Sequence, residues 1–441
     1  MHRQTTRINR LAVGWFAAGL GYALFLYLWR ERYLDPFGGI AWVLYAAMAV
    51  CLWALAQTAA RRIQVFLLTA SIVLPLTLFN AVLEYLHATA GARIQKEMAQ
   101  AAGGDFDMRS PAEALEALRA TDRDAVPALC PSFTGFAFDG GILPLGGWPE
   151  RLTMLGNENG YYASYVADRY GFNNPDSVYE AASGRPRVVL LGDSFAQGFS
   201  VHGGADAASI MRNTGFNVLN LGCASNGPLA QLAGFVEYGS AFGPEVVVFF
   251  YLESNDLADL ARESDTLLAA YLDPEFSQNL PDRRTEIETY LARALSGWGP
   301  KRKRDTLSRL ATLAHVRKLL RGTTPANWSD QITLFADVMT ELVTRLAADH
   351  TDLLVVYLPD GPTLASGTRK SDCRGPASSC KQGILEILAN LDIRVLDFGE
   401  TLSRRGDETS VFSHVQHGHF TEAGYALLGV TIESELRAMG H

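Results

Sequence analysis

The hydrophobic pattern divides the chain into an apolar N-terminal part and a longer part in which short apolar runs alternate with polar stretches. Uncharged runs lie at 11–29, 38–60 and 63–83. Each is close to the roughly 20 residues of helix that cross a bilayer. A cleaved signal peptide has a single short run, so three in succession indicate a permanent anchor. We therefore predict a membrane anchor over 1–90 with about three transmembrane helices.

The side of the membrane depends on how many of these runs span it. Arginines precede the first run and separate the second from the third, which weakly favours a cytoplasmic N-terminus. Three spans would then place the rest of the chain outside the cytoplasm, at a bacterial-type inner membrane, and two spans would leave it inside. Pro75 and Asn80 weaken the third run, which could be kinked or lie on the membrane surface.

Beyond residue 185 the pattern predicts a three-layer α/β/α domain with a parallel sheet. Continuous apolar runs separated by helical stretches are typical of parallel strands buried on both faces. Five such runs occur, at 188–191, 218–221, 246–252, 353–358 and 393–398. Between the third and fourth runs, the stretch at about 257–350 is charged and helix-prone, so we predict a helical insertion that is either a lid or a structural cap.

The segment at 91–184 joins the predicted anchor to the α/β domain. It resembles a stalk up to about residue 130, with a capping box at Ser110, and is then rich in Pro, Gly and aromatic residues. Short strands and turns fit this composition better than long helices. We therefore predict three parts, at 1–90, 91–184 and 185–441.

Charge and cysteine content narrow the function classes. The net charge of −9 argues against a nucleic-acid partner. The basic run at 301–304 is interpreted as a solvated loop before a helix, rather than as a site for lipid headgroups. The five cysteines include no C-x-x-C pair, so a zinc knuckle is not expected. Cys373 and Cys380 could form a disulfide in an oxidising compartment, whereas Cys130 and Cys223 look isolated.

The polar motifs of the domain follow its predicted strands, where ligands bind in parallel α/β sheets. They are Gly192-Asp193-Ser194-Phe195, Asn220-Leu221-Gly222, Glu253-Ser254-Asn255-Asp256 and, before a final apolar helix, His419. A serine hydroxyl needs a base to act as a nucleophile, and a histidine can take and return its proton near neutral pH. A tetrahedral intermediate also needs hydrogen-bond donors aimed at its oxyanion.

This ordered set resembles the SGNH hydrolases, also called the GDSL family. The resemblance covers roughly 185–260 and 410–435. It implies a serine acyl-enzyme mechanism without a cofactor, with Ser194 as nucleophile and His419 as base. It also implies that the oxyanion hole consists of the Ser194 and Gly222 N–H groups and the Asn255 side chain.

The sequence departs from the family pattern just before His419. Family members usually carry an aspartate two or three residues earlier, where this chain has His417 and Gln416. Three alternatives follow. Gln416 or a backbone carbonyl orients the histidine, or Asp407 or Glu408 reaches in, or the site binds without turnover.

Other polar residues have a functional and a structural interpretation. Asn173, in the polar and aromatic turn at 168–175, and Asp193 and Asp256 beside the strand-end motifs, are candidates for the substrate cleft. For Asp193 and Asp256 the alternative, which we favour, is bracing of the loops. For the turn at 168–175 the alternative is packing beneath the sheet. The cluster of His414, His417 and His419 has no carboxylate or cysteine nearby, so we do not expect a metal site.

Three functions remain open from the sequence. The first is a membrane-anchored esterase or deacylase acting on an acyl ester, such as an O-acetyl group of a cell-surface glycan. The second is an O-acetyltransferase for an extracytoplasmic polysaccharide, working with a membrane-bound O-acyltransferase as partner. The third is a degenerate protein that binds carbohydrate or acts as a scaffold. The motifs do not reveal whether water or a sugar hydroxyl accepts the acyl group.

Overall fold

The computed structural model describes most of the chain. The described residues are 2–28, 39–102, 106–131, 141–180, 184–296, 306, 309–321, 328–359, 378–406, 410–413 and 418–441. They form two compact units, which are described separately below. One comprises 1–93 and 300–324, and the other comprises 94–299 and 325–441.

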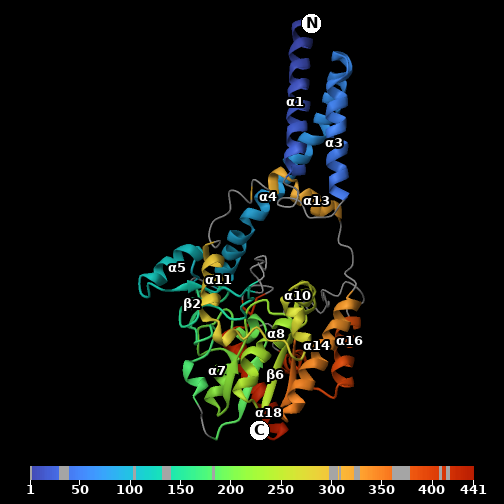
Figure 1. The fold of residues 1–441 in the computed structure, drawn as a ribbon. Helices are drawn as coiled ribbons and strands as arrows, with labels where there is room; N and C mark the ends of the chain where they lie inside the picture. Colours follow the sequence, from blue (N-terminus) through green and yellow to red (C-terminus); the bar gives the residue numbers. More distant parts are fainter. Residues whose placement is uncertain are drawn as a thin grey trace. The chain divides into compact units, whose positions relative to one another are not determined.

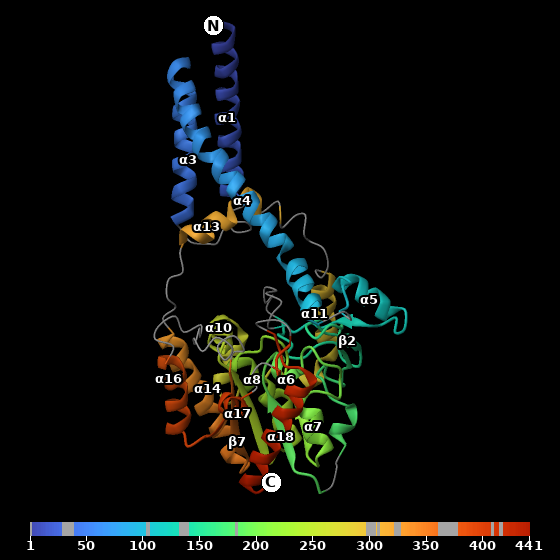
Figure 2. The ribbon, with the colours of Figure 1, turned by 180° about the vertical axis from the view of Figure 1, so that it is seen from behind.

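The first unit is built on apolar helices. These are α1 (His2–Leu28), α3 (Gly39–Leu55) and α4 (Ala59–Ala102), which continues past the unit boundary, together with α13 (Ala314–Arg321) from much later in the sequence. Helices α1 and α3 run side by side in both views (Figure 1, Figure 2). Pro75 lies inside α4 without ending it.

Two helical stretches among the described residues are long and apolar enough to cross a bilayer, at Gln4–Leu28 and Ala59–Ala90, while Leu44–Leu55 is shorter. Side chains such as Leu68 and Leu78 are exposed on the surface of α4. This is compatible with the predicted anchor, while the number of spans and the side of the membrane stay predictions.

The second unit contains the predicted parallel sheet. All five apolar runs form strands, and their order across the sheet is β5-β4-β6-β7-β8, with every neighbouring pair parallel. Their bounds are β4 Arg187–Leu191, β5 Asn217–Asn220, β6 Val246–Leu252, β7 Asp352–Leu358 and β8 Arg394–Asp397. The fold class is therefore confirmed.

Alternate side chains of each strand enter different hydrophobic cores, because successive side chains in a strand point to opposite faces. Along β6, Val247 and Phe249 belong to one core, while Val248 and Phe250 belong to the other.

Helices cover both faces of the sheet (Figure 1, Figure 2). The first core is covered by α8 (Pro228–Gly234), the π-helix η3 (Phe235–Gly239), α10 (Asp256–Glu263), η4 (Leu267–Leu272), η5 (Leu280–Asp282), α11 (Arg284–Ser296), α14 (Ser329–Ala348) and α16 (Ser378–Asn390). The second is covered by α6 (Ser194–Gln197), α7 (Ala207–Asn213), α17 (Phe398–Arg405) and α18 (Glu422–Met439).

The stretch at 257–350 contributes to both units. Helices α10, α11 and α14 belong to the second unit and pack into the first of its two cores, whereas 300–324 belongs to the first unit. The lid and the structural cap both stay predictions.

The segment before the sheet has short elements, as its composition predicts. Helix α5 (Pro111–Arg119) begins with the predicted capping box between Ser110 and Glu113. The strands β1 (Val126–Pro127), β2 (Leu152–Met154) and β3 (Ser164–Val166) form a small separate sheet. Helix η2 (Asp176–Tyr179) ends this segment, whereas the short helix α9 (Ser240–Phe242) lies between β5 and β6.

The cysteine pairing differs in part from the sequence interpretation. Cys130 and Cys223, which looked isolated, form a disulfide across 93 residues of sequence. That interpretation was wrong because residues far apart in sequence meet only once the sheet has formed. Cys380 is also disulfide-bonded, and Cys373, its suggested partner, lies outside the described residues. Cys51 is a free thiol.

Candidate active site

Ser194 lies at the sharp turn between strand β4 and the short helix α6. A Cβ atom on Gly192 would lie 2.7 Å from Ala196 Cβ and 3.0 Å from Phe250 Cβ, so the turn needs glycine there. Asp193 caps α6 by accepting a hydrogen bond from Phe195 N–H. The turn therefore holds the Ser194 side chain at the carboxyl end of the sheet, where it is 8 % exposed.

His419 reaches Ser194 from the loop before α18. Its Nε2 lies 2.6 Å from Ser194 Oγ, although 225 residues separate the two in sequence. The loop is held by the bond from Ser413 N–H to the His419 carbonyl, and Thr421 caps the following helix. The rings of Phe195 and Phe199 lie 4.8 and 4.7 Å from the imidazole. These contacts keep the imidazole over the serine hydroxyl.

A carboxylate that the sequence interpretation missed completes this arrangement. His419 Nδ1 lies 3.0 and 3.1 Å from the two carboxylate oxygens of Glu158, and the His419 backbone N–H donates to Glu158 Oε2 at 2.7 Å. Glu158 belongs to the loop between β2 and β3, 261 residues from the histidine. The orienting candidates suggested by sequence, Gln416, Asp407 and Glu408, lie outside the described residues.

Glu158 and His419 interact electrostatically as well as by hydrogen bonds. Burial alone would raise the pKa of Glu158, but the charge of His419 and its hydrogen bonds outweigh burial and hold that pKa below its ordinary value. An ionised carboxylate can only accept, so His419 Nδ1 carries the proton and Nε2 is free to accept from Ser194 Oγ–H. This is the tautomer that a general base needs.

The three N–H donors predicted to bind an oxyanion differ in whether each already donates a hydrogen bond within the protein. Ser194 N–H is the first N–H of helix α6, and the N–H groups of a first helical turn have no acceptor within their own helix. Asn255 Nδ2 donates one hydrogen to Asp193 Oδ2 at 3.2 Å, which leaves its second hydrogen for another acceptor. Gly222 N–H donates to Asn220 Oδ1 at 2.9 Å, so that donor is already occupied.

Gly222 also has a steric role. A Cβ there would lie 2.4 Å from Gln197 N and 2.6 Å from Ala196 Cβ, which belong to the helix that carries Ser194. The glycine therefore lets β5 and its loop approach α6 closely. This packing explains the residue independently of any donor role.

Asp193 and Asp256 lie behind the site rather than in open space. Both are at most 1 % exposed. Burial raises the pKa of Asp193, and this effect outweighs the hydrogen bonds from Phe195 and Asn255, which lower that pKa. Burial, together with the charge of Asp193, raises the pKa of Asp256 well above its ordinary value. Asp256 Oδ2 accepts a hydrogen bond from Leu252 N–H. These contacts support the bracing interpretation, since they fix Asn255 and the α6 turn.

The polar turn at 168–175 packs under the same helix. Asn173 is 5 % exposed and its Nδ2 donates to the Gln197 carbonyl at 2.8 Å. Asp168 accepts from Phe172 N–H and from the side chains of Asn174 and Tyr179. Asn173 also lines a cavity of about 790 Å³, and the residues lining that cavity do not include the Ser194–His419–Glu158 trio.

Side chains that bind metals do not gather into a site within the described part of the chain. No group of three or more His, Cys, Asp or Glu side chains there could hold a metal ion. His414 and His417 lie outside the described residues.

Comparison with known proteins gives fold-level similarity at low identity. No family model matches the sequence, and no curated protein matches it. A lipase/acylhydrolase from Enterococcus faecalis is 14 % identical with a TM-score of 0.34, over 58 % of this chain and 96 % of the other. A GDSL-like lipase from Bacteroides thetaiotaomicron is 10 % identical with a TM-score of 0.33, over 59 % and 92 %.

A third similar structure is a catalytic mutant of an acetylxylan esterase from Geobacillus stearothermophilus. It is 12 % identical with a TM-score of 0.32, over 58 % of this chain and 95 % of the other. At these TM-scores the similarity carries no functional weight, and the function proposed below rests on the geometry of the site.

Proposed function

We propose that this chain is a membrane-anchored ester hydrolase with a Ser194–His419–Glu158 catalytic triad. The observation that supports this best is the relay of contacts, with Ser194 Oγ 2.6 Å from His419 Nε2 and His419 Nδ1 3.0 Å from Glu158. A serine, a base in the right tautomer and a carboxylate that orients the base are the parts that acyl transfer needs. The idea of a degenerate binding protein rested on a missing carboxylate, and Glu158 removes that reason.

The reaction would proceed in two halves. Ser194 Oγ attacks the ester carbonyl as His419 Nε2 takes its proton, and the imidazolium then protonates the departing alkoxide, leaving an acyl-serine. Water then attacks the acyl carbon as His419 Nε2 takes its proton. The bond between the acyl carbon and Ser194 Oγ breaks, the imidazolium returns the proton to Oγ, and the carboxylic acid is released. Glu158 stays ionised throughout and stabilises the imidazolium. Ser194 N–H and Asn255 Nδ2 donate to the oxyanion in both halves.

For the substrate we propose an O-acetyl ester of a cell-surface glycan, following the resemblance of the strand-end motifs. The disulfides at Cys130–Cys223 and Cys380 support an oxidising, extracytoplasmic location for the site. An O-acetyltransferase would use the same acyl-serine with a sugar hydroxyl in place of water, and a membrane-bound acyl donor protein as partner. The apolar helices of the first unit would suit either function.

The test uses the full-length protein in lipid nanodiscs with a chromogenic acetyl ester. We expect hydrolysis that Ser194→Ala abolishes, and an acetyl group trapped on Ser194 that mass spectrometry detects at early times. Ser240→Ala, an exposed serine of the same unit, is the matched control and should keep full activity. Unchanged hydrolysis in Ser194→Ala would disprove the nucleophile assignment. Acetyl transfer to an added oligosaccharide in preference to water would favour the transferase.

A further inference from the structure

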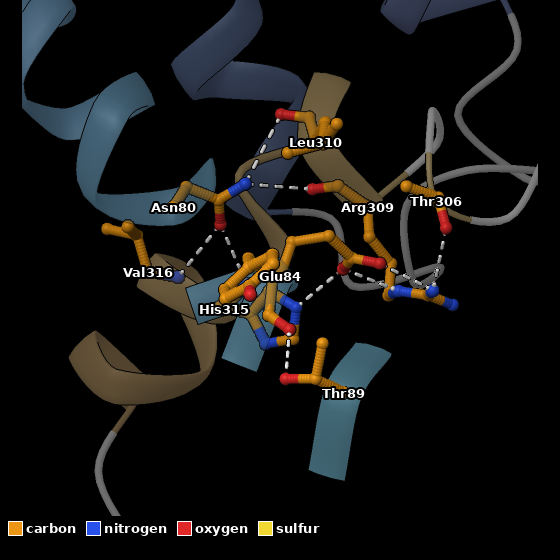
Figure 3. A network of polar contacts seen from close by, with 9 residues as sticks. Asn80, Glu84, Thr89, Thr306, Arg309, Leu310, His315 and Val316 are labelled. Carbon is orange, nitrogen blue, oxygen red and sulfur yellow. Dashed lines mark hydrogen bonds and ion pairs between the residues drawn. The ribbon is translucent and has the colours of Figure 1, made fainter. Parts of the chain in front are cut away.

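The segment at 309–321 belongs to the apolar unit although it lies between α11 and α14 in sequence. It consists of a helical turn at 309–311 and of α13, separated by a break at which Leu313 has a φ of 49°. A leucine with positive φ is strained, and the conformation persists only where the surrounding structure holds it. The contacts of this segment with α4 supply that support (Figure 3).

Asn80 of α4 bonds to both sides of the break. Its Nδ2 donates to the carbonyls of Arg309 and Leu310, at 3.2 and 3.4 Å. Its Oδ1 accepts from the N–H groups of His315 and Val316, at 3.1 and 3.4 Å. The amide therefore bonds to carbonyls of one helical turn and to N–H groups that begin α13, and the Leu310 carbonyl also accepts from Leu313 N–H at 3.3 Å. Asn80 is fully buried by these contacts.

Glu84, one turn further along α4, holds the same segment by charge. Its carboxylate bonds to the Arg309 guanidinium at 2.7 and 2.8 Å and to His315 Nε2 at 2.8 Å. The Glu84 side chain is 4 % exposed and that of Arg309 is 34 % exposed, so the carboxylate is shielded from water while the guanidinium is partly open to it. A buried carboxylate is costly to leave without its cationic partner. The segment is thus bonded to α4 rather than lying loosely beside it.

The residues of α4 that hold this segment lie at the end of the apolar run of that helix. The uncharged run of this helix covers 63–83, and Glu84 is the first charge after it. In a helix that spans a bilayer, the end of the apolar run marks the edge of the hydrocarbon layer. Asn80 and Glu84 therefore hold 309–321 at the depth where acyl chains meet headgroups.

The segment has the composition of an interfacial helix. It contains four Lys and Arg residues and no Asp or Glu. At helical spacing, Val316 and Leu319 share one face of α13, while Arg317 and Lys318 lie on the other. Val316 is buried within the unit, at 6 % exposed, whereas Leu319 is 59 % exposed and Lys318 is exposed as well. An apolar side chain and a cation exposed together match a surface that is apolar on one side and anionic on the other.

We propose that residues 309–321 form a second membrane-binding element, which lies in the headgroup layer of the bilayer that holds the anchor. Leu319 enters the acyl boundary, and Lys318 faces the lipid phosphates. This rests on the proposed membrane anchor. The neighbouring basic run at 301–304, interpreted from the sequence as a solvated loop, lies outside the described residues.

The experiment measures how spin labels on the full-length protein are exposed to oxygen, which concentrates in the acyl layer, and to a water-soluble nickel chelate. Single cysteines replace Leu319, Lys318, Leu78 and Ser240 in a Cys51→Ala background, without reductant so that the disulfides persist. The protein is reconstituted at one copy per nanodisc, with anionic lipid. Leu78, 68 % exposed on α4, reports the anchor, and Ser240 reports water.

We expect the oxygen-to-nickel ratio at Leu319→Cys to approach that at Leu78→Cys and to exceed that at Lys318→Cys severalfold. Adding Asn80→Leu should move the Leu319 label towards the aqueous value. Thr77→Val is the matched control, because Thr77 bonds only to carbonyls of its own helix, and it should change nothing.

Three outcomes would overturn the proposal. An aqueous ratio at Leu319 with a lipid-like ratio at Leu78 would reject the interfacial element and leave the anchor intact. Aqueous ratios at both positions would reject the anchor of the proposed function as well. A Leu319 label shielded from both reagents would show that protein covers this face.

Discussion

Replacing Glu158 by glutamine tests the least expected member of the triad. The carboxylate lies 3.0 Å from His419 Nδ1, which places the centres of charge about 4 Å apart once the imidazole is protonated. The two side chains are 16 % and 21 % exposed, so an effective dielectric constant of about 20 is appropriate and the attraction is about 4 kcal/mol. This corresponds to roughly a thousandfold in rate.

We therefore expect Glu158→Gln to lower kcat by about three orders of magnitude with little change in KM, because the interaction strengthens only when the imidazolium forms. Glu158→Asp, which keeps the charge but is one methylene shorter, should fall between glutamine and wild type. The assay is steady-state hydrolysis of an acetyl ester by full-length protein. Glu150→Gln, an exposed glutamate of the same segment, is the control. A Glu158→Gln enzyme within a fewfold of wild type would refute the triad.

The same substitution has a consequence for stability. The pKa of Glu158 is held below its ordinary value, so the unfolded state binds the proton first as pH falls. Its stabilisation is then complete above the unfolded pKa of about 4.3 and is lost as pH falls through the lower folded pKa. The difference in thermal stability between wild type and Glu158→Gln should therefore shrink between about pH 6 and about pH 3, a range that brackets the unfolded pKa. Parallel pH profiles would contradict this.

Three further outcomes follow from the site. Asn255→Ala should lower kcat about 10²- to 10³-fold in the ester assay with KM nearly unchanged, and a change confined to KM would argue against an oxyanion role. Gly222→Ala should abolish activity by displacing α6, whereas Gly234→Ala, whose Cβ would meet only Leu221 at 3.9 Å, should retain it. Replacing both Cys130 and Cys223 by alanine should cost about 2–5 kcal/mol of stability and lower the melting temperature, and an unchanged melting temperature would show that the bond constrains little.

The sheet and most of its motifs could be predicted from the sequence because local patterns determine them. The run at 246–252 is apolar throughout, as a strand buried on both faces must be, and it forms the central part of the sheet. Ser194 and Asn255 follow such strands directly, so their convergence follows from the parallel topology. Their roles in catalysis stay predictions until activity is measured.

Glu158 could not be found in this way. It lies in an irregular loop, Gly156-Asn157-Glu158-Asn159-Gly160, whose polar residues are equally typical of a surface turn. Its partner is 261 residues away, and no spacing rule connects a loop of the small sheet with the loop before α18. The attachment of 309–321 to α4 was hidden for the same reason, since Asn80 looked only like a polar defect in an apolar run and Glu84 only like the charge that ends it.

The division of the chain into two units also determines how the part that carries the Ser194–His419–Glu158 trio could be separated from the apolar helices. The backbone passes between the units after residues 93, 299 and 324, so a single protease cut near residue 93 would leave the rest still attached through 300–324. A recombinant fragment beginning at residue 94 would keep 309–321 without the helix that satisfies it, exposing apolar surface and inviting aggregation. A soluble catalytic fragment should therefore also replace 297–327 with a short polar linker.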